Sequence, residues 1–417
     1  MLSYLGRSPL YNRDYVLYGY DVLHRDNVAK NNRLYVDKDR DLLRVFTDAI
    51  SVHRFDELSE GLPVHFCFTK QLLMSNLPFL MPPDKIVVEL YGENINDAAT
   101  INKLRELNRA GYKLALGGLT VKTTALRNQN CANLFDYIYL NVHIHSKLQL
   151  IDMFKELSNR TNAYVIAEQV DTEDDFDKAI AMNFKMYQGL LFGMPSVLRR
   201  EVNLAWTPCG KLFNLLAMPK SSVETIVKML MTDKVLRHLC LGYTYRARSG
   251  INIEELLSEN LTEMGMEKLR KWSCVLILKL MNLNDTLDIS RKAYCRGLFM
   301  EKLLARSGMD AVPFTGFLLG VFSLMSEVTD TPMESLLSQF LLDDEVKAVL
   351  LRHEENIYSA FLDYAVFFER EQDVPRIPAL SSLSFTRELL TALYRECQRE
   401  TNTAFLTKAP LMIHDVL

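Results

Sequence analysis

The sequence predicts two domains of different class: an α/β barrel comes first and an all-α domain follows it. Strand-like and helical segments alternate through residues 15–192, and from residue 206 onward the apolar pattern is helical almost everywhere. Strands that alternate with helices form a parallel or mostly parallel sheet, and a closed (β/α) barrel is the form we expect. We place the barrel domain at residues 1–202 and the helical domain at residues 206–407.

Seven segments of the first half have the composition and alternation of strands. They are residues 15–23, 63–68, 85–90, 112–117, 136–142, 163–169 and 184–192. Helical segments separate most of them, and residues 37–53 show the pattern well, because Leu42, Val45 and Phe46 fall on one face. Another helix is expected after Thr172, where acidic residues follow at the positive end of the helix dipole.

The second half has the apolar period of amphipathic helices. In residues 221–231, Ser221 and Glu224 have the spacing of a capping box, and apolar residues then recur at helical intervals. The longest nearly apolar run, residues 314–325, is shorter than the ~20 residues that a membrane span needs. We therefore interpret this run as a buried helix.

Composition limits the class of protein. The formal net charge of −4 argues against a globally basic nucleic-acid-binding protein, and one basic cluster at residues 237–248 is interpreted as a solvent- or protein-facing loop. The seven cysteines are scattered without C-x-x-C spacing, as expected for reduced thiols rather than for disulfides or a zinc site. The N-terminus has no apolar signal segment. We expect a cytoplasmic protein that binds neither a membrane nor nucleic acid.

A pair of glycines, Gly117 and Gly118, ends the strand expected at residues 112–117. In barrels built from alternating strands and helices, the carboxyl ends of the strands carry the active site. A tight turn is by itself a sufficient reason for two adjacent glycines. The other strand ends therefore decide whether the pair is a turn or marks the loss of functional side chains.

A series of short motifs follows the strand segments. In order they read YGYDVLHR (18–25), FCFTKQLL (66–73), VVELYGEN (87–94), GYKLALGGLTV (111–121), FDYIYLNV (135–142), VIAEQVDTEDDF (165–176) and YQGLLFGMP (187–195). Together they resemble the EAL domain family, TIM-like barrel enzymes that hydrolyse cyclic di-GMP in bacteria. The resemblance runs from residue 7 to about residue 200.

The resemblance identifies the strand positions at which the family holds metal ions and phosphate. At six of them this chain differs: Asp21 replaces a glutamate, Cys67 an asparagine, Gly117 and Gly118 two aspartates, Tyr139 a lysine and Asn141 an aspartate. Glu89, Glu168 and Gln188 are retained, with Leu23 and Arg25 from the first motif. Phosphodiester hydrolysis of this kind needs metal ions, and hard divalent cations need several convergent oxygen ligands. We therefore expect a degenerate site without catalytic residues, metal or cofactor.

Two roles stay open for the retained residues. Glu89 and Glu168 are either inherited scaffolding, hydrogen-bonded at the barrel mouth, or part of a residual nucleotide-binding site. The residues of that second interpretation are Leu23, Arg25, Glu89, Glu168 and Gln188. An arginine such as Arg25 grips a phosphate by bidentate contacts, or pairs equally well with an acid.

The helical half contains the motif LTEMGMEKLRKW (261–272), with Gly265 and Trp272. From about Leu212 to about Phe368 it resembles the HDOD domain, an HD-related module that lacks the catalytic His-Asp pair. The one His-Asp dipeptide, at residues 414–415, lies in the C-terminal tail. The pair His143 and His145 has strand spacing, but a surface loop is the simpler interpretation.

We expect a non-enzymatic bacterial signal-transduction protein that acts through protein–protein interaction. The resemblance implies a role near cyclic di-GMP signalling, in the control of motility or biofilm formation. The alternatives are a cyclic di-GMP receptor that binds without hydrolysis, and a very weak cyclic di-GMP phosphodiesterase. The protein partner is not identified by the sequence, cyclic di-GMP is a candidate ligand, and a homodimer is left open.

Overall fold

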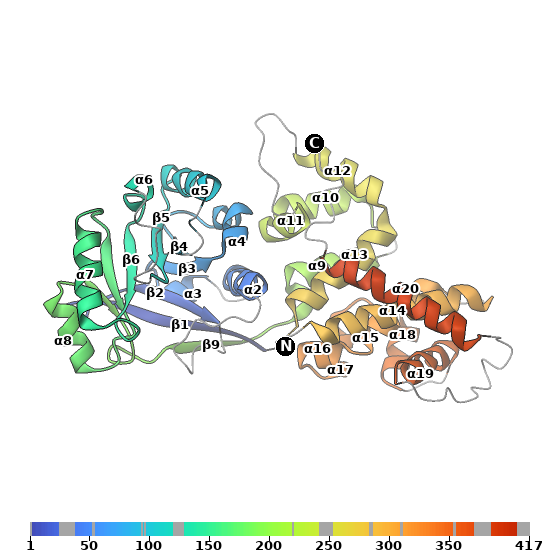
Figure 1. The fold of residues 1–417 in the computed structure, drawn as a ribbon. Coiled ribbons are helices and arrows are strands. Elements are labelled where there is room, and N and C mark those ends of the chain that lie inside the picture. The colour runs from blue at the N-terminus through green and yellow to red at the C-terminus, as the bar shows by residue number, and fades with distance from the viewer. Residues whose placement is uncertain are drawn as a thin grey trace. The chain divides into compact units, whose positions relative to one another are not determined.

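The computed structural model forms two compact units, which are described separately (Figure 1). It describes residues 2–24, 38–51, 55–92, 95, 97–119, 129–218, 221–241, 253–282, 287–308, 312–352, 356–370 and 385–406. Residues 2–201 belong to the first unit, and the described helices from Val202 onward belong to the second. The domain limits 1–202 and 206–407, as limits of independently folding fragments, stay a prediction.

The first unit is a closed barrel of eight strands with a ninth strand attached. The bounds are β1 (Leu2–Asn12), β2 (Leu17–His24), β3 (Val64–Phe68), β4 (Ile86–Tyr91), β5 (Lys113–Gly117), β6 (Tyr137–Asn141), β7 (Tyr164–Glu168), β8 (Met186–Gln188) and β9 (Ser196–Glu201). Strands β2 to β8 pair in chain order and are parallel. Strand β1 closes the barrel, because it pairs antiparallel with both β2 and β8. The predicted α/β barrel is confirmed.

Strands β1 and β9 are not among the strands that the sequence predicts. Strand β1 contains Gly6 and Pro9, two residue types that strands disfavour, and this hides it from pattern analysis. Strand β8 is also shorter than the segment 184–192 that predicts it. Strand β9 pairs antiparallel with the first residues of β1 and is not one of the eight strands that close the barrel.

Helices lie on the outside of the strands (Figure 1). They are α2 (Lys38–Ser51), α3 (Phe55–Ser59), α4 (Lys70–Met74), η1 (Leu77–Leu80), α5 (Ala98–Arg109), α6 (Gln129–Ala132), α7 (Lys147–Ser158) and α8 (Glu173–Ala181). Side chains at the N-caps fix where several of them begin: Asp97 caps α5, and Ser146 and Thr172 form capping boxes with Gln149 and Asp175. The helix predicted after Thr172 is therefore present as α8.

The interior of the barrel is filled by side chains. A buried cluster there consists of Leu10, Val87, Ala115, Tyr137, Tyr139, Ile166 and Met186. Because side chains alternate along a strand, the residue two positions further on faces the same side. By this rule Glu89, Gly117, Asn141, Glu168 and Gln188 form the next layer, at the carboxyl end of the barrel.

The second unit is all-α in its described residues. Its helices are η3 (Leu204–Trp206), α9 (Pro208–Ala217), α10 (Val223–Thr232), α11 (Lys234–Leu241), α12 (Ile253–Met264), α13 (Met266–Leu280), α14 (Asp288–Ser307), α15 (Pro313–Phe322), α16 (Met325–Thr329), α17 (Met333–Gln339), α18 (Asp344–Leu350), α19 (Ile357–Glu369) and α20 (Arg387–Leu406). The predicted cap of α10 is wrong by one residue: Ser222 accepts a hydrogen bond from Thr225 N, whereas Ser221 Oγ donates to Leu215 O.

Helices α14 and α15 pack at close range in the core of this unit. A Cβ added at Gly320 would lie 2.6 Å from the Cα of Gly297, so both positions need glycine. Every residue of α15 from Thr315 to Phe322 is buried, which confirms the buried helix predicted there. None of the described helices is long and apolar enough to cross a membrane.

A buried ion pair connects α14 with α19. The Arg296 guanidinium donates to both carboxylate oxygens of Glu369, from Nε at 3.1 Å and from Nη2 at 2.7 Å. Its Nη1 donates to Ser323 Oγ at 2.9 Å. The Arg296 side chain is 7% exposed and that of Glu369 is 1% exposed, so each charge depends on the other.

Candidate functional site at the carboxyl end of the barrel

The strand register gathers the predicted positions at one end of the barrel. Cys67 on β3 is the partner of Glu89 on β4, and Glu168 on β7 lies between Asn141 and Gln188. Leu23 belongs to β2, but its side chain is not among those described. Arg25, most of the basic cluster at 237–248 and the dipeptide at 414–415 lie outside the described residues.

Neighbouring side chains occupy the space in front of the glycine pair. A Cβ added at Gly117 would lie 2.4 Å from Glu89 Oε1 and 3.3 Å from Tyr91 Cε1. A Cβ at Gly118 would lie 2.4 Å from Cδ1 of the same tyrosine ring. Gly118 also has a left-handed backbone, with φ +62°, which favours glycine. Glu89 and Tyr91 therefore fill the volume that side chains at these two positions would use.

The acids that the sequence singles out on β2 and β4 are buried. Asp21 and Glu89 are each 0% exposed, and Gln188 is 3% exposed. Gln188 Nε2 donates to Asp21 Oδ2 at 3.0 Å, which joins β8 to β2, the two barrel strands on either side of β1. Glu168 is half-buried. Of the two retained glutamates, only Glu168 is accessible to water in this structure.

Tyr139 takes part in a polar network inside the barrel. Its hydroxyl is 2.8 Å from Nδ1 of His65 on β3, and both residues are buried. One layer below, the hydroxyls of Tyr137 and Tyr18 lie 2.6 Å apart. Burial, followed by the hydrogen bond between Tyr137 and Tyr18, raises the pKa of Tyr137. Tyr139, for which the resemblance implies a family lysine, thus contacts a histidine that the sequence pattern does not single out.

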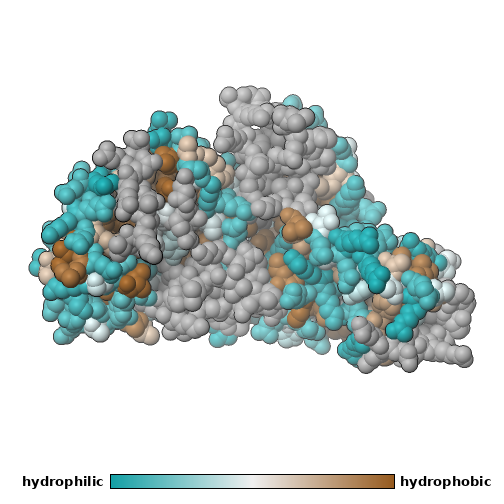
Figure 2. Space-filling view, viewed as in Figure 1, coloured by the Kyte–Doolittle hydropathy of each residue, from teal (hydrophilic) through white to brown (hydrophobic). Residues whose placement is uncertain are grey.

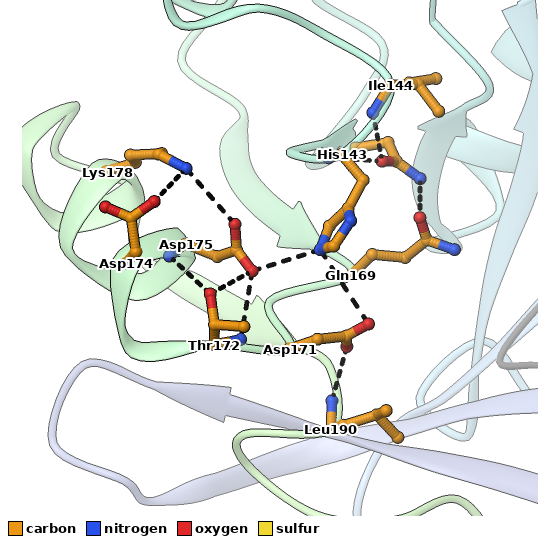
Figure 3. Close-up of polar contacts among 10 residues, drawn as sticks. His143, Ile144, Gln169, Asp171, Thr172, Asp174, Asp175, Lys178 and Leu190 are labelled. Carbon is orange, nitrogen blue, oxygen red and sulfur yellow. Dashed lines mark hydrogen bonds and ion pairs between the residues drawn. The ribbon is translucent and has the colours of Figure 1, made fainter.

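Asn141 uses its side chain to shape the turn after β6. Its Oδ1 accepts hydrogen bonds from the backbone N–H groups of His143 at 2.9 Å and Ile144 at 3.1 Å. Its Nδ2 donates to Gln169 Oε1 at 2.9 Å, in the loop after β7 (Figure 3). The amide oxygen is therefore directed at the backbone of its own loop.

The two histidines of this turn have different surroundings. His143 is 44% exposed, and its Nε2 lies 3.2 Å from Asp175 Oδ2 in the capping box of α8 (Figure 3). Burial opposes ionisation of Asp175, but hydrogen bonds from Thr172 and the charge of His143 outweigh it and hold the pKa of this carboxyl below its ordinary value. His145 is buried and contacts Leu119 O at 3.0 Å, so the surface-loop prediction holds for His143 alone.

Several positions at this end of the barrel offer no oxygen donor, or one that already accepts a hydrogen bond. Gly117 and Gly118 supply no oxygen, Asn141 Oδ1 is engaged by two backbone amides, and Asp21 Oδ2 accepts from Gln188. Cys67 offers sulfur, which hard cations do not prefer. Among the described residues, no group of three or more His, Cys, Asp or Glu side chains is arranged to hold a metal ion.

Comparison with known protein families finds a match for most of the barrel. The family model described as "EAL domain" matches residues 65–195, which span β3 to β8. This part of the chain is an EAL domain. The match confirms the family resemblance of the barrel.

Two curated proteins are similar over most of their length. "Uncharacterized protein YuxH" from Bacillus subtilis is 23% identical over 377 residues, covering 86% of this chain and 88% of that protein. "Cyclic di-GMP phosphodiesterase CdgJ" from Vibrio cholerae is 23% identical over 372 residues, covering 88% and 85%. Among solved structures, the EAL domain of Mycobacterium smegmatis DcpA has a TM-score of 0.37 and 14% identity, covering 47% of this chain and 93% of that chain.

Proposed function

We propose that this chain is a non-enzymatic signal-transduction protein in cyclic di-GMP signalling, in which a degenerate EAL domain acts through protein–protein contacts. Its EAL domain relates it to cyclic di-GMP signalling. The observation that carries the proposal is the filled carboxyl end, where Glu89 lies over Gly117 and Tyr91 lies over Gly118.

The chemistry of the known reaction supports this proposal. Metal ions that generate hydroxide and polarise a phosphate need convergent oxygen ligands and an open position for the substrate. Here Asp21 and Glu89 are fully buried, and two strand-end positions carry no side chain. Scaffolding is accordingly our proposal for Glu89 and Gln188, since both are packed inside the barrel.

We assign the helical unit to the HDOD type as part of the same proposal. The motif that suggests the HDOD type, residues 261–272, is at the junction of α12 and α13. Gly265 has φ +78° there, as a turn between two helices requires, and Trp272 on α13 is 9% exposed. An HD-related module without its catalytic pair would serve as an interaction domain, consistent with a role in motility or biofilm control.

The surface does not identify the partner. Described areas of the face in Figure 2 are mostly hydrophilic, with separate hydrophobic areas. Leu148, Met194 and Trp206 are 74%, 72% and 75% exposed. Single apolar side chains of this kind are ordinary on protein surfaces, so no one area is assigned to a partner. A homodimer stays a prediction.

Two alternatives keep a role for the dinucleotide. A receptor would use the predicted set of Leu23, Arg25, Glu89, Glu168 and Gln188, of which Glu168 is half-buried and Glu89 is buried. A weak phosphodiesterase is favoured by the name of the relative CdgJ. Both require cyclic di-GMP to enter the carboxyl end of the barrel. The proposed non-enzymatic role, in which the chain is an adaptor that acts through protein–protein contacts, does not.

Calorimetry separates the adaptor from the receptor. We expect an affinity for cyclic di-GMP weaker than about 1 µM, with or without magnesium, because Glu89 and Tyr91 fill the barrel mouth and Glu168 repels phosphate. Isothermal titration of the full chain with the dinucleotide is the measurement. Saturable binding at or below about 1 µM, lost on Arg25→Ala, would replace the adaptor proposal by the receptor.

A further inference from the structure

The side chains on the inner face of β4 and β5 are complementary in size. Val87, Glu89 and Tyr91 alternate along β4 and face the barrel interior. The residues that the register places beside Glu89 and Tyr91 on β5 are Ala115 and Gly117. Large side chains on one strand therefore lie against very small ones on the next.

This complementarity leaves no space for larger residues on β5. Real Cβ atoms essentially never approach a heavy atom within 3.0 Å, and both glycine positions would place one at 2.4 Å. At Gly117 the nearest atom is the end of the flexible Glu89 side chain. At Gly118 it belongs to the Tyr91 ring, which is rigid and half-buried at the end of β4.

Charge adds to the steric conflict at position 117. Glu89 is 0% exposed, and its Oε1 is the atom nearest to a Cβ at that position. An aspartate there would place a second carboxylate beside the first in a position shielded from solvent. Two such groups repel each other strongly at low dielectric.

We propose that Glu89 and Tyr91 form an internal plug: the Tyr91 ring makes glycine a requirement of the fold at position 118, and the two side chains together exclude ligand-binding groups from the volume in front of positions 117 and 118. The packing part of this inference stands on the contacts alone. Its consequence for metal binding rests on the proposed function. Restoring acidic residues at the pair is therefore not sufficient to restore a metal site, because the plug occupies the same volume.

A double-mutant cycle in the full chain tests the packing. Gly118→Ala adds a Cβ against the Tyr91 ring at φ +62°, whereas Gly61→Ala adds one at φ +81° with nothing within 4 Å. The control therefore has the backbone strain without the crowding. Urea unfolding is monitored by hydrogen exchange of the β4 and β5 peptides. We expect Gly118→Ala to lower the urea midpoint of the barrel at least twice as much as Gly61→Ala does.

Removing the ring should abolish this difference. In a Tyr91→Ala background, or Tyr91→Val if that variant does not fold, Gly118→Ala should shift the midpoint only as much as Gly61→Ala does. Equal shifts of Gly118→Ala and Gly61→Ala in the wild-type background would overturn the plug, and so would an unchanged effect of Gly118→Ala after removal of the ring.

Manganese titration tests the consequence for metal binding. The variant Gly117→Asp/Gly118→Asp is titrated with Mn²⁺ and followed by electron paramagnetic resonance. We expect no saturable binding at or below about 1 mM. Saturable binding would contradict the exclusion of ligands by the plug. Failure of the proposed function would show separately, as hydrolysis by the wild-type chain, and would leave the double-mutant cycle unaffected.

Discussion

Gly189→Ala is expected to destabilise the barrel by about 3 kcal/mol, because the added methyl group would collide with backbone. A Cβ at Gly189 would lie 2.1 Å from Val170 O and 2.3 Å from Val170 N. These backbone atoms are held by hydrogen bonds with Gln188 and Leu191, so they cannot yield cheaply. The glycine of the Gln188-Gly189 pair thus has a packing role that needs no catalysis.

This loss of stability is measured by urea unfolding, with hydrogen exchange of the β7 and β8 peptides as the readout. Gly61→Ala is a control in the same unit for backbone strain without collision, since its φ is +81° and nothing lies within 4 Å of its added Cβ. A loss below about 1 kcal/mol for Gly189→Ala would mean that the loops after β7 and β8 do not approach as closely as described.

Glu369→Ala is expected to destabilise the helical unit by about 3–5 kcal/mol, because it leaves the Arg296 charge buried without its carboxylate. The pair is bidentate and almost completely shielded from water. Lys292 lies 3.7 Å from the same carboxylate, but it is 47% exposed and is hydrated in any case.

Unfolding of the helical unit can be followed separately by tryptophan fluorescence. The chain has two tryptophans, Trp206 and Trp272, and both lie outside the barrel unit. Urea unfolding followed by tryptophan fluorescence therefore reports on the helical unit. The double variant Arg296→Met/Glu369→Leu should recover most of the loss, because paired apolar replacements remove both charges. A double variant as unstable as Glu369→Ala would show that packing, not the unpaired charge, causes the loss.

Periodicity predicts the architecture well where strands and helices are regular. The alternation of apolar residues identifies β2 to β8, and the helical period identifies the second half. It fails at β1, whose Gly6 and Pro9 interrupt the pattern and whose partners lie at both ends of the barrel sequence. Such pairing depends on residues far apart in the chain, which local patterns do not encode.

The sequence predicts which side chains of the site are missing, but not what takes their place. Gly117 and Gly118 are predicted to replace ligands because the neighbouring motifs resemble those of the EAL family. Nothing in the local pattern indicates that Tyr91 lies over the second glycine, because this follows from the register of β4 with β5. Equally, Tyr139 and His65 are 74 positions apart and meet only through the barrel.

The most direct test of a non-catalytic barrel is product analysis with cyclic di-GMP. The purified full chain is incubated with the dinucleotide and magnesium or manganese, and linear product is quantified by chromatography against a protein-free control. We expect no linear product above that control, since Gly117 and Gly118 offer no ligands and Glu89 is buried. Linear product formed well above the control, and abolished by Glu89→Ala, would contradict this and show that the barrel is a phosphodiesterase.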